Sequence, residues 1–200
     1  MEYLTNKQTV EDRMERVMRS PKPVLFLDYD GTLAPFSVER DQAFPYPGVS
    51  EALTGIIAST RTRLVIVTGR PIDDLMPLLA LDPMPEIFGS HGWERRRPDG
   101  TRFTFPLPSE AQRVIEDAGF WITQNGLEAQ SEVKPASVTI HWRGLPEASR
   151  HKLRQAALDA WTPFTNVESI ELTPFDGGLE LRVLGQDKGN AVRTVMTEVG

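Results

Sequence analysis

The sequence predicts an α/β protein built on a parallel sheet, with a second unit of α+β type inserted before the last helix. Short apolar runs at 24–27, 64–67 and 87–88 alternate with amphipathic segments, which is typical of a parallel sheet packed against helices. The first run is apolar without interruption, as in a strand that is buried on both faces. Beyond residue 95 the strands alternate between apolar and polar residues, which indicates an antiparallel sheet.

Composition narrows the classes of function. The chain has 200 residues, enough for one large domain or two small ones with a buried core. It contains no run of about eighteen apolar residues and no secretory signal at its N-terminus, so a membrane partner is not expected. The absence of cysteine excludes disulfides and thiolate metal sites, and a formal net charge of -6 disfavours a nucleic-acid partner. We therefore expect a cytoplasmic protein with a small-molecule partner.

The first half of the chain is divided by proline, glycine and changes in hydrophobic period. Pro71 suits the first turn of a helix, and Ala52 is among the residues expected to face inward from the helix before it. The predicted order is a helix at 5–19, a strand at 24–27, a loop at 34–48, a helix at 49–59, a strand at 64–67, a helix at 72–81 and a strand at 87–88.

The second half is predicted from alternation and from helix caps. Ser109 is placed as a helix cap, and Met196 is expected to face inward from the last helix. The predicted order is a weak strand at 101–107, a helix at 109–121, a half-buried strand at 137–143, a helix at 146–161, strands near 166–172 and 178–184, and a helix after 187. The chain then divides into an N-terminal helix (1–21), a core (22–96 and 184–200) and an insert (97–183).

Two carboxylates follow the first predicted strand directly. Asp28 and Asp30 are two residues apart, so they can point the same way at the carboxyl end of the strand, where ligands bind in parallel sheets. Like charges this close need a cation or a shared proton. The alternative is an ordinary Asp-Gly turn made by Asp30 and Gly31.

Two further groups suit the binding of an anion. Thr68 and Gly69 follow the second strand where a helix begins, so backbone N–H groups and the hydroxyl could bind phosphate oxygens. Lys188 lies at the start of the last helix, where its charge is unfavourable unless an anion is close. The alternatives are a helix capped by threonine without a ligand, and a solvated surface lysine.

Together these strings resemble the motifs of the haloacid dehalogenase superfamily of phosphoryl-transfer enzymes. The resemblance implies a Rossmann-like core with an inserted cap domain. It assigns Asp28 as the nucleophile, Asp30 as the acid/base, and Thr68 with Lys188 as the phosphate-binding pair. It also implies a Mg²⁺ cofactor held by Asp28 and Asp30. This division of labour between two carboxylates is chemically reasonable.

Three more strings are similar to the trehalose-6-phosphate phosphatase family: 89–94, 132–143 and 180–182 followed by Lys188. The resemblance implies hydrolysis of trehalose 6-phosphate to trehalose and phosphate through an aspartyl-phosphate. Val183 departs mildly from the family, which usually has proline there. Each cap residue also has a structural alternative, for example a cross-strand pair of Glu180 and Arg182. The substrate-binding residues implied are Gly69, Arg70, His91, Lys134, His141, Arg143, Glu180 and Arg182.

The superfamily's fourth acidic motif has no counterpart before Gly200. From this we expect missing core strands, an exposed edge at the first strand that is available for self-association, and impaired hydrolysis by the chain as it stands. A phosphatase for another sugar phosphate, a non-catalytic sugar-phosphate-binding domain and an incomplete fragment remain alternatives.

Overall fold

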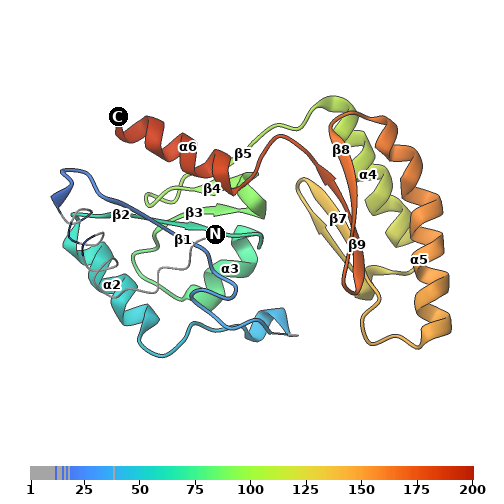
Figure 1. The fold of residues 1–200 in the computed structure, drawn as a ribbon, viewed down its shortest axis with the longest axis horizontal. Coiled ribbons are helices and arrows are strands. Elements are labelled where there is room, and N and C mark those ends of the chain that lie inside the picture. Colours follow the sequence, from blue (N-terminus) through green and yellow to red (C-terminus); the bar gives the residue numbers. More distant parts are fainter. Residues whose placement is uncertain (1–11, 13–14, 16, 18, 38) are drawn as a thin grey trace.

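The structure is a computed structural model that describes residues 12, 15, 17, 19–37 and 39–200. Most of the helix expected at 5–19 lies outside the described residues. The described chain forms two units, each built on its own sheet, which lie side by side in Figure 1. In this part of the chain no helix is both long and apolar enough to cross a membrane.

The first sheet confirms the predicted parallel core. Strands β1 (Val24–Leu27), β2 (Arg63–Val67) and β3 (Glu86–Gly89) pair in parallel, in the order β1-β2-β3, and β1 is an edge strand whose residues are only half-buried. Helices α2 (Val49–Ser59) and α3 (Ile72–Leu79) cover one face. Helix α6 (Lys188–Val199) packs on the other face, above the sheet in Figure 1.

Two short strands that follow β3 extend this sheet. Strand β4 (Glu94–Arg96) pairs antiparallel with β3, and β5 (Arg102–Thr104) pairs antiparallel with β4. The single turn η2 (Ser90–Gly92) lies between β3 and β4, and η1 (Arg40–Gln42) lies in the loop after β1. The boundary expected at residue 97 stays a prediction, but this pairing adds β5 to the first sheet.

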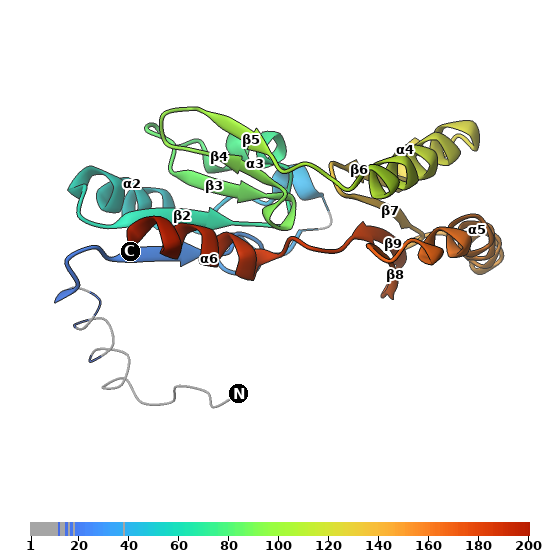
Figure 2. The ribbon, with the colours of Figure 1, turned by 90° about the horizontal axis from the view of Figure 1, so that it is seen from above.

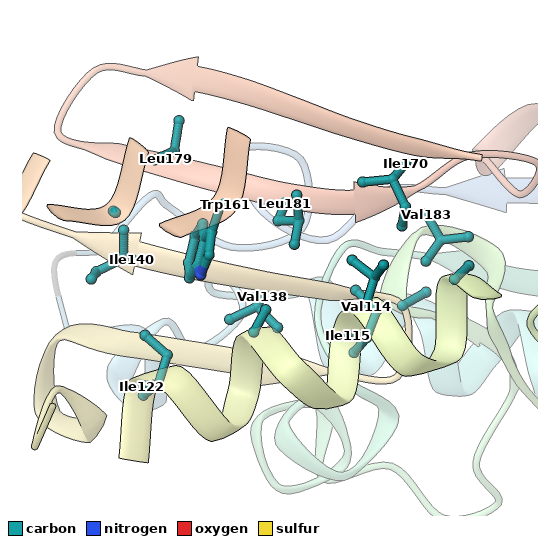
Figure 3. Packing of buried hydrophobic residues seen from close by; sticks show 14 of the residues in the cluster. Val114, Ile115, Ile122, Val138, Ile140, Trp161, Ile170, Leu179, Leu181 and Val183 are labelled. Carbon is teal, nitrogen blue, oxygen red and sulfur yellow. The ribbon is translucent and has the colours of Figure 1, made fainter. Parts of the chain in front are cut away.

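The second unit is an antiparallel sheet with two helices on one face. Its strands are β6 (Ser131–Lys134), β7 (Ser137–His141), β8 (Ile170–Phe175) and β9 (Gly178–Val183), in the order β6-β7-β9-β8. Helices α4 (Ser109–Gln124) and α5 (Glu147–Trp161) cover the apolar face, where Val138, Ile140, Leu181 and Trp161 are buried together (Figure 3). Short turns η3 (Glu128–Gln130) and η4 (Thr162–Asn166) complete this unit, which we call the cap.

Four local predictions were wrong. Pro108 rather than Ser109 caps α4, and neither forms a side-chain cap hydrogen bond. Strand β7 is buried on both faces, because its polar face is turned toward the first unit instead of solvent. Ala52 and Met196 are exposed, since α2 and α6 each present a narrower apolar stripe to the sheet than the sequence pattern indicated.

A network of ion pairs fixes α6 to the first sheet. Glu86 of β3 and Arg95 of β4 are buried and form an ion pair, although both side chains are charged. Glu198 near the end of α6 accepts from Arg95 at 2.8 Å and from Arg63 at 2.6 Å. Buried charges persist when they are paired and hydrogen-bonded. The network therefore holds the helix that begins with Lys188.

Candidate functional site

The turn after β1 sets the positions of the two aspartates. The Tyr29 carbonyl accepts hydrogen bonds from the amides of residues 32–34, at 2.9–3.1 Å. Gly31 has φ +75°, a backbone conformation that glycine adopts far more readily than other residues. A Cβ atom there would lie 2.5 Å from the exposed Phe36 ring, which would have to move. The Asp-Gly turn considered from the sequence does form, and it places Asp28 and Asp30 at the carboxyl end of the parallel strands.

Lys188 contacts Asp28, which lies 160 positions earlier in the sequence. Its Nζ donates to Asp28 Oδ2 at 2.6 Å, and the other oxygen of Asp28 accepts from the Tyr29 amide at 2.8 Å. The two side chains are about equally exposed, at 41% and 40%. Asp187 caps α6 by accepting from the Asn190 amide. The anion that the sequence required near Lys188 is therefore the carboxylate of Asp28.

Asp30 faces a different partner. Arg70 donates Nε to both Asp30 oxygens, at 2.9 and 3.1 Å, and Nη2 to Oδ1 at 2.6 Å. The Arg70 side chain is only 4% exposed, and its guanidinium also lies 5.5 Å from the centre of the Tyr29 ring. Burial raises the pKa of Tyr29 to about 12, so its hydroxyl stays neutral and donates to the Ala43 carbonyl. Asp30 is therefore hydrogen-bonded to Arg70, whereas Asp28 is paired with Lys188.

Thr68, Gly69 and His91 pack together just beyond the carboxyl ends of β2 and β3. Thr68 is fully buried, and its hydroxyl accepts from the Arg70 amide at 3.1 Å, so it does not cap α3, whose N-cap is Pro71. A Cβ atom on Gly69 would lie 2.5 Å from Cε1 of His91, which shows how closely the imidazole covers this backbone. His91 itself has φ +57°, a strained conformation for a residue other than glycine.

The polar face of the cap sheet lies opposite this part of the core. Lys134, Ser137 and Arg182 form one cross-strand row, because Lys134 pairs with Ser137 and Ser137 with Arg182. Glu180 lies one row further along and accepts from Thr139. A cavity of about 520 Å³ is lined by residues of both units. Its lining includes Ser90, His91, Trp93, Lys134, Ser137, Glu180, Arg182, Asp187, Lys188 and Asn190.

Three cationic side chains and two carboxylates line the cavity, and His91 lies among them. Burial lowers the pKa of His91 below its usual value, and nearby Lys134 lowers it further. Glu180 acts in the opposite direction, while Lys188 and Arg182 add to the lowering. His91 is therefore mainly neutral at pH 7, and it can donate or accept a hydrogen bond from a ligand.

A second cavity, of about 610 Å³, is lined by predicted residues as well as by residues that the sequence did not indicate. Arg70 and His141 line it, together with Arg40 and Glu132. Arg40 and Glu132 form an ion pair between the core and the cap, and Glu132 Oε1 lies 3.4 Å from Lys134 Nζ. Burial would raise the pKa of Glu132, but Lys134 and Arg40 outweigh it and lower the pKa.

Glu132 has one signal in the sequence, its place in the string that carries Lys134, and Arg40 has none. For His141, burial lowers the pKa, and the charge of Glu132 opposes this effect.

The structure does not bring Arg143 to this group. Its guanidinium donates to the carbonyl and carboxylate of Asp176, at 2.8 and 3.1 Å. It lines a separate cavity between α5 and the β8–β9 turn. Arg143 follows the end of β7, two residues beyond His141, and the β8–β9 turn holds its guanidinium.

Oxygen donors that could hold Mg²⁺ are few. Among the described residues, no group of three or more His, Cys, Asp or Glu side chains gathers in a metal-binding arrangement. The donors that the family resemblance implies are the Asp28 carboxylate and the Asp30 backbone carbonyl. Mg²⁺ prefers octahedral oxygen coordination and keeps several waters. These two residues therefore fit a Mg²⁺ whose remaining ligands are water and the phosphate of a substrate.

Solved structures share this arrangement of core and cap. A haloacid dehalogenase-like hydrolase from B. subtilis is 12% identical, with a TM-score of 0.58 over 88% of this chain and 78% of its own. A trehalose-6-phosphate phosphatase domain from C. albicans is 18% identical, with a TM-score of 0.68 over 90% of this chain and 63% of its own. These likenesses show the fold, which is that of the haloacid dehalogenase-like hydrolases.

Sequence comparison narrows the class further. The family model for trehalose-phosphatase matches residues 26–200, so the chain belongs to the trehalose-phosphatase family. A structure described as a trehalose-6-phosphate phosphatase related protein is 26% identical, with a TM-score of 0.62 over 86% of this chain and 72% of its own.

Curated relatives are longer than this chain. The trehalose-phosphate phosphatase of Mycobacterium leprae is 29% identical over 170 residues, which are 76% of this chain and 37% of the relative. That of Mycobacterium tuberculosis is 30% identical over 168 residues, 76% of this chain and 40% of the relative. The chain thus spans less than half the length of these relatives.

Proposed function

We propose that the chain hydrolyses a sugar phosphate, most specifically trehalose 6-phosphate, to the free sugar and phosphate. The observation that carries the proposal is the contact of Lys188 Nζ with Asp28 Oδ2 at 2.6 Å, together with the cavity between core and cap that Lys188 also lines. The carboxylate can attack phosphorus while the ammonium group neutralises negative charge on the phosphate oxygens. Family membership supports this chemistry.

In the proposed reaction an Asp28 oxygen forms a bond to phosphorus, and the bond from phosphorus to the sugar oxygen breaks. Asp30, protonated on Oδ2 at that stage while Arg70 keeps its hydrogen bonds to Oδ1, gives its proton to the leaving oxygen. Water then attacks the aspartyl-phosphate while Asp30 takes up a proton, and phosphate leaves with Asp28 restored. Lys188 binds phosphate oxygens. The Thr68 hydroxyl is the second proposed donor to the phosphate, although its side chain is fully buried in the arrangement seen here. A bound Mg²⁺ would supply further neutralisation of the phosphate charge.

The sugar binds in the 520 Å³ cavity. Lys134, Glu180 and Arg182 lie on the cap side of this cavity and His91 on the core side, so hydroxyl groups would meet both donors and acceptors. Gly69 acts by letting the imidazole of His91 approach closely. Arg70, His141 and Arg143 are not part of this lining, and substrate contacts by them are not proposed for the arrangement seen here.

A cytoplasmic location and self-association through the β1 edge stay predictions.

The test compares wild type with Asp28→Asn in the presence of trehalose 6-phosphate and Mg²⁺. Loss of the nucleophile should lower phosphate release by at least about 10³-fold. The exposed residue Asp117 on α4 offers a matched control, Asp117→Asn, whose rate should equal that of wild type. Phosphate release by Asp28→Asn at the wild-type rate would refute the catalytic role.

Two alternative functions can be tested with the wild-type protein. A panel of sugar phosphates distinguishes another substrate, because the preferred one gives the highest kcat/KM. Calorimetry distinguishes a non-catalytic sugar-phosphate-binding domain, for which trehalose 6-phosphate binds tightly without turnover.

A further inference from the structure

Hydrogen bonds connect Asp30 to the cap through Arg40. Arg70 binds the Asp30 carboxylate with Nε and Nη2, and it donates Nη1 to the Arg40 carbonyl at 2.6 Å. The side chain of Arg40 then forms an ion pair with Glu132 on β6. The connection therefore runs from the proposed acid/base, through two arginines, to a strand of the cap sheet.

The middle of this connection has little freedom to adjust. Arg70 is 4% exposed, and a planar guanidinium that binds a carboxylate through two nitrogens fixes the orientation of that carboxylate. The third nitrogen is directed at a backbone carbonyl in the single turn η1. A shift of the Arg40 backbone would therefore change the hydrogen bond that orients Arg70, and with it the plane of the Asp30 carboxylate.

The cap end of the connection involves residues of both cavities. Arg40 and Glu132 line the 610 Å³ cavity, while Lys134, 3.4 Å from Glu132, lines the 520 Å³ cavity. A ligand that engages Lys134 competes with Glu132 for the same ammonium group. Such a ligand would thereby leave Glu132 more fully available to Arg40.

We propose that Arg40 is a positioning residue that couples closure of the cap to the orientation of Asp30. With the cap closed, Glu132 fixes the Arg40 side chain, the Arg40 carbonyl fixes Arg70, and Arg70 aims the Asp30 carboxylate. This inference rests on the proposed function of Asp30. The simpler interpretation is an ion pair without further consequence, since the Arg40 side chain is 43% exposed and such pairs contribute little.

The test uses two substrates that differ in their need for an acid. The sugar oxygen of trehalose 6-phosphate must be protonated as it leaves, whereas the leaving group of p-nitrophenyl phosphate is stable as an anion. Arg40→Gln should lower kcat for trehalose 6-phosphate about tenfold with a smaller change in KM. For p-nitrophenyl phosphate it should leave unchanged the first-turnover burst of p-nitrophenolate, which reports formation of the aspartyl-phosphate alone. Steady-state turnover of this substrate is not used, because water attack on the intermediate also needs Asp30 as a base. Arg40→Lys, which keeps the charge, should recover most of the loss.

The matched control is Arg102→Gln. Arg102 also forms an exposed ion pair, with Asp73, and its side chain is 46% exposed against 43% for Arg40. This variant should match wild type on both substrates. The inference is overturned if Arg40→Gln behaves like Arg102→Gln, or if it slows formation of the aspartyl-phosphate equally from both substrates, because a loss common to both in that step does not act through the acid.

A measurement without substrate separates this inference from the proposed function. In ¹⁵N NMR spectra the Arg70 Nε–H signal reports its hydrogen bonds to Asp30. Arg40→Gln should shift this signal and speed its exchange with solvent, and Arg102→Gln should not. If wild type releases no phosphate from either substrate, the proposed function fails and this signal alone decides the coupling. A signal unchanged in Arg40→Gln would then overturn it.

Discussion

Replacing Glu198 by glutamine tests how strongly α6 is held to the core. Glu198 accepts two parallel hydrogen bonds from Arg95, both at 2.8 Å, and another from Arg63 at 2.6 Å. The bonds from Arg95 are the main cause that lowers the pKa of Glu198 from 4.5 to about 2, against an opposing effect of burial. Glutamine keeps the size of the side chain and removes its charge, so the variant measures the charged pairing.

The magnitude follows from the pKa. A fall from 4.5 to about 2 corresponds to about 3 kcal/mol of preference for the charged form in the folded state. The side chain is 32% exposed, so solvent screening reduces this figure, and we expect a loss of about 1–2 kcal/mol in the free energy of unfolding at pH 7. Because the folded pKa is depressed, the stabilisation is fully present above the unfolded value of 4.5. It is lost as the pH falls from there toward 2.

Urea unfolding followed by circular dichroism at several pH values measures the effect. The difference between wild type and Glu198→Gln should be constant at neutral pH and should shrink steadily below pH 4.5. Glu116 on α4 is exposed and contacts the neutral side chain of Gln112, so Glu116→Gln serves as the control with little effect. A difference that is absent at pH 7, or that does not change on acidification, would refute the electrostatic account of α6.

Two further variants test the site and the cap. In Gly69→Ala the new methyl group displaces the His91 ring, so phosphate release should fall about tenfold. An unchanged rate would contradict a role for His91 in substrate binding. The melting temperature of this variant should move by less than about 4 °C. Leu181→Ala opens a cavity in the cap core and should cost about 2–5 kcal/mol in urea unfolding, whereas Val133→Ala on an exposed side chain should cost under about 0.5 kcal/mol; equal losses would contradict the packing in Figure 3.

The parallel core could be predicted because its signals are local. Apolar runs specify β1, β2 and β3, and the glycine at 31 specifies the turn that places the aspartates. Strand β4 could not be predicted in this way. Its residues are Glu-Arg-Arg, and its buried Arg95 is tolerated only because Glu86 and Glu198 accept from it. Those partners come from β3 and α6, so no local pattern could indicate the pairing.

The site residues also differ in whether a local sequence pattern could indicate them. The contact between Asp28 and Lys188 spans 160 positions and was expected only through resemblance to a family. Arg143 shows the limit of that resemblance. It follows β7 beyond His141, and four steps along a strand cover about 13 Å, so residues at the end remote from Ser137 cannot share its cavity. Arg40 carries no sequence signal at all, because its importance depends on where its backbone carbonyl lies.

The connections between the two units suggest why chemistry and substrate binding are coupled in this fold. Only residues 184–187 separate β9, which carries Glu180 and Arg182, from Lys188 at the start of α6, and residues 105–108 form the other connection (Figure 2). Phe105 packs against the cap core and also against the α6 side of the first sheet. A movement of the cap therefore pivots next to Lys188, so a ligand held by the cap sheet also constrains the ammonium group that faces Asp28.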